Sequence, residues 1–315
     1  MHGNPKNGQF APGGLRAVLL AGALVVHASG CSSGERRSLA PDTPPRSLRI
    51  IDGRTDRALD YETVVEAISG ADVVVLGEEH DDLLASRLQL ELLESLHRRR
   101  DSTVLALEMV ERDEGPLLED YLAGAVDEQT LLSGLHATEA GRAVFRQHTM
   151  PLLRLARARG IPVVAANAPR RYVRAARLQG YDHLRSLPAE TRALYRIPEE
   201  LDRGDYRRRV EALMRRDDVV LDPDRVDDFM RAQELWDQTM ADSVLQATDA
   251  GEGPVVLVVG RFHGDFGGGT IERILEQDPG IEVRYLVTIG AGVGPLRLED
   301  ADRADYVVYT GKPPG

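Results

Sequence analysis

The sequence contains few cysteines, lysines and aromatic residues, and each shortage narrows what the protein can be. Cys31 is the only cysteine among 315 residues, so no disulfide can form within the chain. Lys6 and Lys312 are the only lysines, and the net charge is −12. Nucleic-acid binding needs a clustered excess of basic residues, so we expect no nucleic-acid partner. Aromatic residues make up only 5%, whereas 42% hydrophobic and 29% charged residues are ordinary for a globular protein.

Residues 1–31 have the form of a bacterial export signal. Basic residues come first, and the apolar run at 15–26 is shorter than the roughly 20 residues that a membrane-spanning helix needs. The small residues Ala28-Ser29-Gly30 then lead to Cys31 and resemble a lipobox, although Ala28 stands where leucine is usual. We expect lipidation of Cys31, which would explain the single thiol; the alternatives are ordinary cleaved export or a wrongly assigned start codon.

The segment after this cysteine predicts a tether and a location. Residues 32–47 are rich in serine, proline and charge, which cannot form a core, so we expect a flexible tether. A single domain should then occupy residues 48–310. The resulting prediction is an exported, membrane-anchored lipoprotein of the cell envelope. In a host with an outer membrane it would lie there, because Ser32 is not the usual retention signal, aspartate.

Short apolar runs alternate with longer helical patterns after about residue 48. Each run is mainly apolar and does not alternate polar with apolar residues, which is typical of strands buried on both faces of a parallel sheet. The runs are residues 72–76, 103–107, 161–166, 255–259, 283–288 and 305–309. Residues 83–100 and 150–159 have helical periodicity, and the charged interval at about 170–250 contains no strand-like run. The predicted fold is α/β, with a central, mostly parallel sheet flanked by helices and a helical insertion.

Two Gly-x-x-His motifs follow predicted strands. Gly77-Glu78-Glu79-His80 ends the first run, and Gly260-Arg261-Phe262-His263 ends the fourth. Ligands of open α/β sheets bind beyond the carboxyl ends of the strands, and a glycine lets the chain leave a strand sharply. Two imidazoles and a carboxylate gathered there could bind a divalent metal or perform acid–base chemistry. We therefore expect Glu78, His80 and His263 to share one site.

Further polar residues fall near the same predicted edge. Glu108 follows the second run, where a charge beside buried strand needs a partner, and Asn167 follows the third. We expect Glu108 to join the site. Asp82 is better explained as a helix cap, Glu79 should face away from the site, and the glycines at 267–269 are better explained as a turn or lid than as an anion site. Trp236 and Met240 should pack in the core, and we expect His97, His136, His148 and His183 to lie on the surface.

These elements together resemble the ChaN-like haem-binding lipoproteins, a family grouped with the Tiki metalloproteases and the erythromycin esterases. The similar segments include Leu76-Gly77-Glu78-Glu79-His80-Asp81, Ala106-Leu107-Glu108-Met109, Pro162-Val163-Val164-Ala165-Ala166-Asn167, Trp236-Asp237-x-x-Met240-Ala241 and Val259-Gly260-Arg261-Phe262-His263. The resemblance runs in one order from about residue 50 to 310. It implies an exported lipoprotein that binds haem or iron, with His80 and His263 as cofactor-binding residues, and that works with a haem or iron transport system.

The same resemblance also implies a second function. In the Tiki relatives, paired Gly-x-x-His motifs and a glutamate serve metal-dependent hydrolysis, which would make His80, Glu108 and His263 metal ligands, with Glu78 also catalytic. The chain departs from many ChaN-like sequences at Ala85 and Ser86, where those have histidines. Haem iron would then need His80, His263 or a tyrosine of the insertion, namely Tyr172, Tyr181, Tyr195 or Tyr206. Haem or iron binding is the first hypothesis, a metal-dependent protease or esterase the alternative, and a non-catalytic structural lipoprotein the third.

Overall fold

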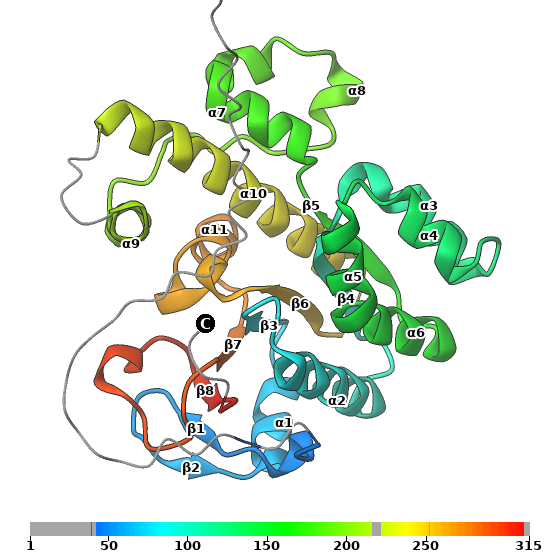
Figure 1. The fold of residues 1–315 in the computed structure, drawn as a ribbon, viewed down its shortest axis with the longest axis vertical. Helices are drawn as coiled ribbons and strands as arrows, with labels where there is room; N and C mark the ends of the chain where they lie inside the picture. Colours follow the sequence, from blue (N-terminus) through cyan, green and yellow to red (C-terminus); the bar gives the residue numbers. More distant parts are fainter. Residues whose placement is uncertain (1–38, 40–41, 216–221, 252, 312–315) are drawn as a thin grey trace, which may run out of the picture.

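The fold is built on one eight-stranded sheet, seen in the computed structural model (Figure 1). The structure describes residues 39, 42–215, 222–251 and 253–311. Cys31 and the predicted export signal lie outside the described residues. The strands run in the order β2-β1-β8-β7-β3-β6-β4-β5. Their bounds are Ile50–Asp52 (β1), Ala58–Leu59 (β2), Val73–Glu78 (β3), Val104–Glu111 (β4), Val163–Asn167 (β5), Val255–Gly260 (β6), Val283–Ile289 (β7) and Tyr306–Tyr309 (β8).

The six predicted strands are confirmed as β3 to β8, and they run parallel to one another. The prediction missed β1 and β2, which add an antiparallel edge next to β8. These two strands have only three and two residues, too few to stand out as an apolar run. The predicted α/β class with a mostly parallel sheet and flanking helices is confirmed.

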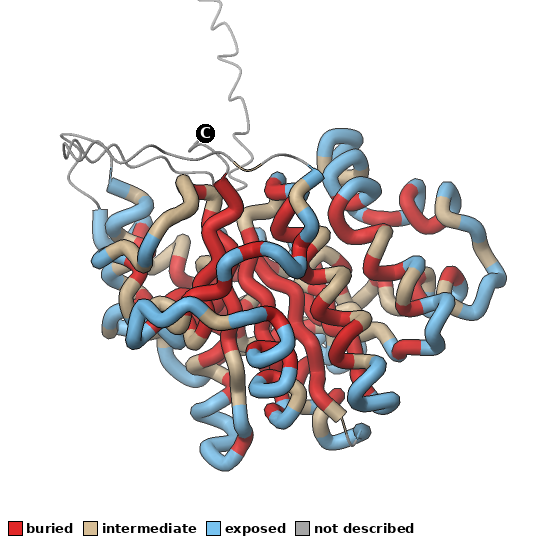
Figure 2. Tube along the Cα trace, turned by 90° about the horizontal axis from the view of Figure 1, so that it is seen from below, coloured by how far each residue is buried: buried red, intermediate tan, exposed pale blue. Residues whose placement is uncertain are grey.

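The two faces of the sheet are buried under different helices. One face, including Val74 and Leu76 of β3, packs in a core with the leucine-rich helix α2 and its neighbours. The opposite face, including Val73 and Val75, packs against α10 and α11. The strands therefore lie in the middle of the molecule, with exposed residues mainly on the outer helices and loops (Figure 2). Burial on both faces explains why most residues of these strands are apolar.

The helices of the first layer lie between and after the first strands. They are α1 (Tyr61–Ser69), α2 (Leu83–Arg99), α3 (Gly115–Ala123), α4 (Glu128–Gly134), α5 (Glu139–His148) and α6 (Met150–Arg159). Asp82 caps α2, as predicted, by accepting hydrogen bonds from the amides of Leu84 and Ala85. This cap makes α2 begin five residues after β3, so the loop that carries His80 is short.

The interval that was predicted to be helical contains α7 (Arg170–Arg185), α8 (Ala189–Arg192), α9 (Asp205–Met214) and α10 (Pro223–Ala250), with no strand among its described residues. Figure 1 shows α7 and α8 at the end of the molecule away from β1 and β2. The helix α10 spans 28 residues and packs against α7, β5 and α11 (Thr270–Gln277). It therefore connects the outlying helices to the sheet.

The chain before β1 contacts the domain earlier than predicted. Residues 45–47, expected in the flexible tether, form a 3-10 turn (Pro45–Ser47) with Pro45 buried. Arg46 pairs with Glu91 of α2 at 2.7 Å. Residues 45–47 therefore pack on the domain. Among the described residues, no helix is both long enough and apolar enough to cross a membrane.

Candidate functional site

Three neighbouring strands bring the predicted site residues to one edge of the sheet. In the sheet order, β6 lies between β3 and β4. Glu78, the last residue of β3, is aligned with Gly260, the last residue of β6. Glu108 lies in β4 directly after Leu107, which is aligned with Val258 of β6. His80 and His263 follow β3 and β6, so the strand order explains why these segments, distant in sequence, meet.

The glycine of the second motif makes room for a histidine of the first. A Cβ on Gly260 would lie 3.0 Å from both Cε1 and Nε2 of His80, and 3.4 Å from Oε2 of Glu108. The same glycine donates its amide hydrogen to Glu108 Oε2 at 2.5 Å. Its φ of −57° is ordinary for any residue. The chain does leave the strand here, because a 3-10 turn begins at Arg261, but this backbone conformation does not itself require glycine. The missing side chain instead allows close approach of the imidazole.

Glu78 holds the ring of His80. The Nδ1 atom of His80 lies 3.2 Å from Glu78 Oε1, and Gln89 of α2 donates to Glu78 Oε2 at 2.8 Å. Burial opposes protonation of His80, but the hydrogen bond with Glu78 and the charges of Glu108 and Glu78 outweigh it and raise the pKa. A carboxylate fixed in this way sets the tautomer of the imidazole and leaves Nε2 as the reactive nitrogen.

His263 is held by a carboxylate that the sequence did not reveal. Its Nδ1 lies 2.7 Å from Oδ1 of Asp237 on α10. Asp237 is fully buried and accepts hydrogen bonds from the hydroxyls of Tyr206 at 2.7 Å and Thr270 at 2.8 Å. Burial opposes protonation of His263, but the charge and hydrogen bond of Asp237, with the charge of Glu108, raise the pKa to about 9. His263 is therefore an imidazolium at neutral pH.

The imidazolium of His263 faces Glu108. Its Nε2 lies 3.7 Å from Glu108 Oε1. Both side chains are nearly buried, and Asn167 supports the strand by donating to the carbonyl oxygen of Glu108 at 3.0 Å. His80 is more open, with 35% of its side chain exposed. The arrangement thus has a buried charged pair, Glu108 and His263, beside an accessible imidazole.

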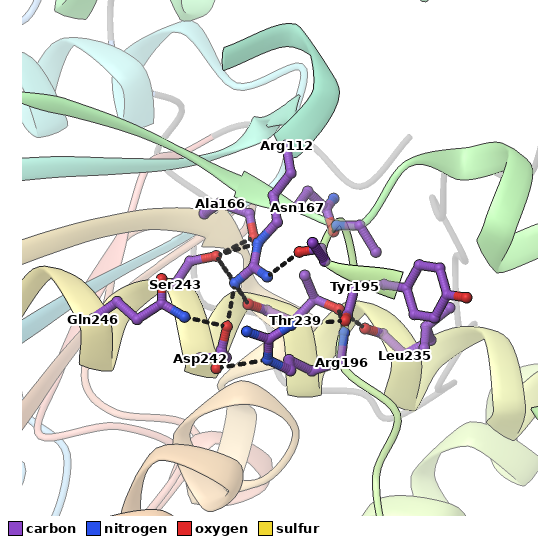
Figure 3. A network of polar contacts seen from close by, with 12 residues as sticks. Arg112, Ala166, Asn167, Tyr195, Arg196, Leu235, Thr239, Asp242, Ser243 and Gln246 are labelled. Carbon is purple, nitrogen blue, oxygen red and sulfur yellow. Dashed lines mark hydrogen bonds and ion pairs between the residues drawn. The ribbon is translucent and has the colours of Figure 1, made fainter. Parts of the chain in front are cut away.

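A polar network connects α10 to the sheet (Figure 3). Asp237 lies on this helix, so the network helps to position it. Arg112, just after β4, donates to Asp242 at 2.6 Å and to the hydroxyl of Ser243 at 2.6 and 3.0 Å. Ser243 donates in turn to the carbonyl oxygen of Ala166 in β5 at 2.9 Å. These contacts join α10 to the ends of two strands. Nothing in the sequence around Arg112 had indicated this role.

The proposed metal ligands are not gathered into a compact donor set. Among the described residues, one group has ligand atoms that all lie within 4.8 Å of one another, and it consists of Glu111, the last residue of β4, with Asp113 and His136. The group of the two histidines and Glu108 is more widely spaced. Glu111 and Asp113 already pair with Arg170 and Arg171. A metal would moreover have to displace the proton of His263, since only neutral imidazole coordinates metal.

Other predicted positions have mixed outcomes. His148 is buried, with Nδ1 2.8 Å from the hydroxyl of Ser86, so the prediction of a surface histidine is wrong for it. His136 is exposed, as predicted, while His97 and His183 are half-buried. Glu79 pairs with Arg261, whose Nε lies 3.3 Å from Glu79 Oε1. Met240 is in the core, as predicted, and Trp236 packs beside it with its ring edge-on to His263.

The tyrosines of the insertion are mostly committed to structural hydrogen bonds. Tyr181 donates to the carbonyl oxygen of Arg231, and Tyr195 to that of Leu184. Burial raises the pKa of Tyr181, Tyr195 and Tyr206 above the ordinary value, which disfavours the phenolate form. Tyr172 is half-buried, and its ring packs 5.1 Å from that of Tyr195.

Comparisons with known proteins agree with this arrangement. Residues 64–274 match the model of a family described as "Haem-binding uptake, Tiki superfamily, ChaN". ChaN of Campylobacter jejuni, solved with cofacially bound haem, has the same fold, with a TM-score of 0.64 and 15% identity over 83% of this chain and 96% of that one. Weaker matches include the erythromycin esterase EreC, a mutant in its open conformation (TM-score 0.43, 15% identity, 77% and 76% coverage). The type III effector HopBA1 also matches (TM-score 0.46, 16% identity, 86% and 100% coverage). No curated protein matches the sequence.

The family match covers two thirds of the chain and includes Glu78, His80, Glu108 and His263. It also includes Asp237, the carboxylate on α10. The chain therefore belongs to the ChaN family of haem-binding uptake proteins, within the Tiki superfamily.

Proposed function

We propose that this protein binds haem, or the iron it carries, for uptake, with His80 as the iron ligand. The observation that carries this proposal is the exposure of the His80 side chain, in a chain that belongs to a haem-binding family. Its side chain is 35% exposed, whereas those of Glu78, Glu108 and His263 are exposed by 12% or less. A ligand as large as a tetrapyrrole needs an accessible side chain, and His80 has the most exposed side chain of these four residues.

The surroundings of His80 fit an axial ligand. Haem iron takes its axial ligand from His, Tyr, Met or Cys. In the neutral ring, Nδ1 donates its hydrogen to Glu78, which Gln89 holds in place, and Nε2 is then the coordinating atom. A carboxylate partner of this kind strengthens a ligating imidazole. Because the pKa of His80 is raised, coordination must displace a proton, so binding should strengthen as the pH rises.

We place the protein in the cell envelope, anchored through a lipid on Cys31. The form of residues 1–31 supports this, with an apolar run that ends at small residues before the single cysteine. The segment before Pro45 would then connect the haem-binding domain to the membrane, and the domain would transfer its ligand to a haem or iron transport system. Labelling of the expressed protein with a fatty acid, in the wild type and in Cys31→Ser, tests this part.

A haem titration tests the site. Wild-type protein and the variants His80→Ala and His183→Ala are titrated with haemin, and the Soret absorbance is recorded. The wild type and His183→Ala, which changes a half-buried histidine of α7, should show the same saturable shift. His80→Ala should lose the shift or bind at least tenfold more weakly. A Soret titration that does not distinguish His80→Ala from the wild type would contradict the assignment.

A metal-dependent hydrolase is the second candidate, because His80, Glu108 and His263 do come from three adjacent strands. In this alternative, Glu78, Glu108 and the two histidines would bind a divalent ion that activates a water molecule for attack on an amide or ester. The proton on His263 opposes this below about pH 9. Metal analysis of protein purified without chelator provides the test. Equal metal content in the wild type and the double variant His80→Ala/His263→Ala would exclude this alternative.

A further inference from the structure

Arg209 is an arginine whose charge has no anionic partner within the described residues. It lies on α9 next to two other arginines, and both of those are paired: Arg207 with Asp227 and Glu211, and Arg208 with Asp205. No carboxylate of the described residues lies within ion-pair distance of the Arg209 guanidinium, and its Nε is buried without a hydrogen-bond partner.

Aromatic rings and a glycine hold this guanidinium in place. Its central carbon lies 5.6 Å from the ring centroid of Tyr206 and 5.4 Å from that of Phe266. A Cβ on Gly268 would lie 2.1 Å from a terminal nitrogen of Arg209, so any other residue there would push the guanidinium out of this position. The rings attract a cation through their faces but offer no acceptor to its N–H groups.

The charge is therefore partly removed from water, and no carboxylate of the described residues forms an ion pair with it. Asp265, Glu272 and Asp202 stabilise it only from beyond ion-pair distance. Burial lowers the pKa of Arg209, although Tyr206 and Asp265 act in the opposite direction. Asp265 is already paired with Arg261 and Arg303. A half-buried cation is unfavourable when no anion contacts it directly, as holds here for the described residues, and an anion supplied by a ligand would offset that cost.

The same residues connect this cation to the candidate site. Tyr206, whose ring faces Arg209, donates its hydroxyl to Asp237, and Asp237 holds His263. Phe266 follows His263 by three residues and is 40% exposed, with Arg303 4.5 Å from its ring centroid. An exposed aromatic ring flanked by two guanidinium groups suits a ligand that is both planar and acidic.

We propose that Arg209 binds a carboxylate of the ligand, namely a propionate of the tetrapyrrole, with Phe266 as the aromatic surface beside it. This inference rests on the proposed haem binding. Arginine suits the task because its planar fork can donate two parallel hydrogen bonds to one carboxylate. Such a contact would orient the acidic edge of the ligand towards α9.

Haem and its dimethyl ester, which lacks the two acid groups, distinguish this contact from iron coordination. Both are titrated against the wild type, Arg209→Met and the control Arg208→Met, in which an exposed, ion-paired arginine of the same helix is changed. Methionine preserves much of the packing of the arginine stem against the rings. The wild type and Arg208→Met should prefer haem over the ester by about tenfold, the contribution of one charge-assisted contact.

Arg209→Met should bind haem about tenfold more weakly than the wild type and should bind both compounds alike. Because Arg209 has no ion pair with any described residue, the thermal unfolding of the variant should stay within a few degrees of the wild type, which checks folding. A variant that keeps the preference for haem would overturn the role of Arg209 and leave haem binding intact. If the wild type binds neither compound, the proposed function itself fails, and this inference fails with it.

Discussion

Replacing Asp237 with asparagine should lower the pKa of His263 from about 9 to below the ordinary value of 6.5. The asparagine is similar in size but removes the negative charge that lies 2.7 Å from Nδ1. Burial, which opposes protonation, would then be countered only by Glu108. The rise from 6.5 to about 9 corresponds to about 3 kcal/mol of preferential stabilisation of the imidazolium.

The same pair should make the stability of the protein depend on pH. His263 has a higher pKa in the folded protein than in the unfolded chain, so its contribution is fully present below about pH 6.5. The contribution is lost as the pH rises through about 9. We therefore expect the free energy of unfolding of the wild type to fall by about 3 kcal/mol across this window. Asp237→Asn should lack this fall.

Two measurements check the prediction in ligand-free protein. The chemical shift of the His263 Cε1 proton, followed by NMR against pH, gives the pKa directly. Urea unfolding at a series of pH values gives the stability. Asp249→Asn is the matched control, because Asp249 is exposed on the same helix. A His263 that titrates near 6.5 in the wild type, or that titrates alike in the wild type and Asp237→Asn, would refute the reasoning.

Three other substitutions test the surroundings of the site. Glu78→Gln should lower the pKa of His80, because its hydrogen-bonded carboxylate is lost, and NMR titration of His80 measures this. Gly77→Ala should destabilise the protein by about 1–3 kcal/mol, because a Cβ there would lie 2.4 Å from a tyrosine hydroxyl of β7. Gly70→Ala, which has open space around it, should change the urea midpoint little and is the control. Arg112→Met should cost about 2–3 kcal/mol in the same assay, since it breaks the buried network below α10; a loss near zero would show that this network does not hold the helix.

Much of the sheet was predictable from the sequence because a strand that is buried on both faces consists mainly of apolar residues. Residues 72–76, apolar after Asp72, and residues 255–259 form two clear apolar runs, and they correspond to β3 and β6. The edge strands β1 and β2 are too short to form a recognisable apolar run. Their partner strand β8 identifies them only once the chain is folded.

The site was predictable only where its residues end strands. Glu78, Glu108 and the two histidines follow apolar runs, so their shared edge could be expected from the parallel sheet. Asp237 lies instead in the middle of a long helix, 26 residues before His263. An aspartate between Trp236 and Met240 can face either solvent or core, and the sequence does not specify which. The resemblance of this segment to the family was the available signal.

The prediction that His148 lies on the surface was wrong for a related reason. It ends α5 in a polar stretch, Arg146-Gln147-His148, which is typical of an exposed helix end. Packing of α5 against α2 buries it and pairs it with Ser86. Ser86 occupies one of the positions where histidine was expected from the family resemblance. Contacts between helices decide such cases, and a periodic pattern along one helix carries no information about them.

The central claim, that His80 binds haem iron, is tested most directly by a crystal structure of the wild-type protein grown with haem. We expect a porphyrin at the carboxyl ends of β3 and β6, with iron bonded to Nε2 of His80 and with Nδ1 still hydrogen-bonded to Glu78. Iron bonded to another residue, such as Tyr172, or a porphyrin located away from this edge, would contradict it.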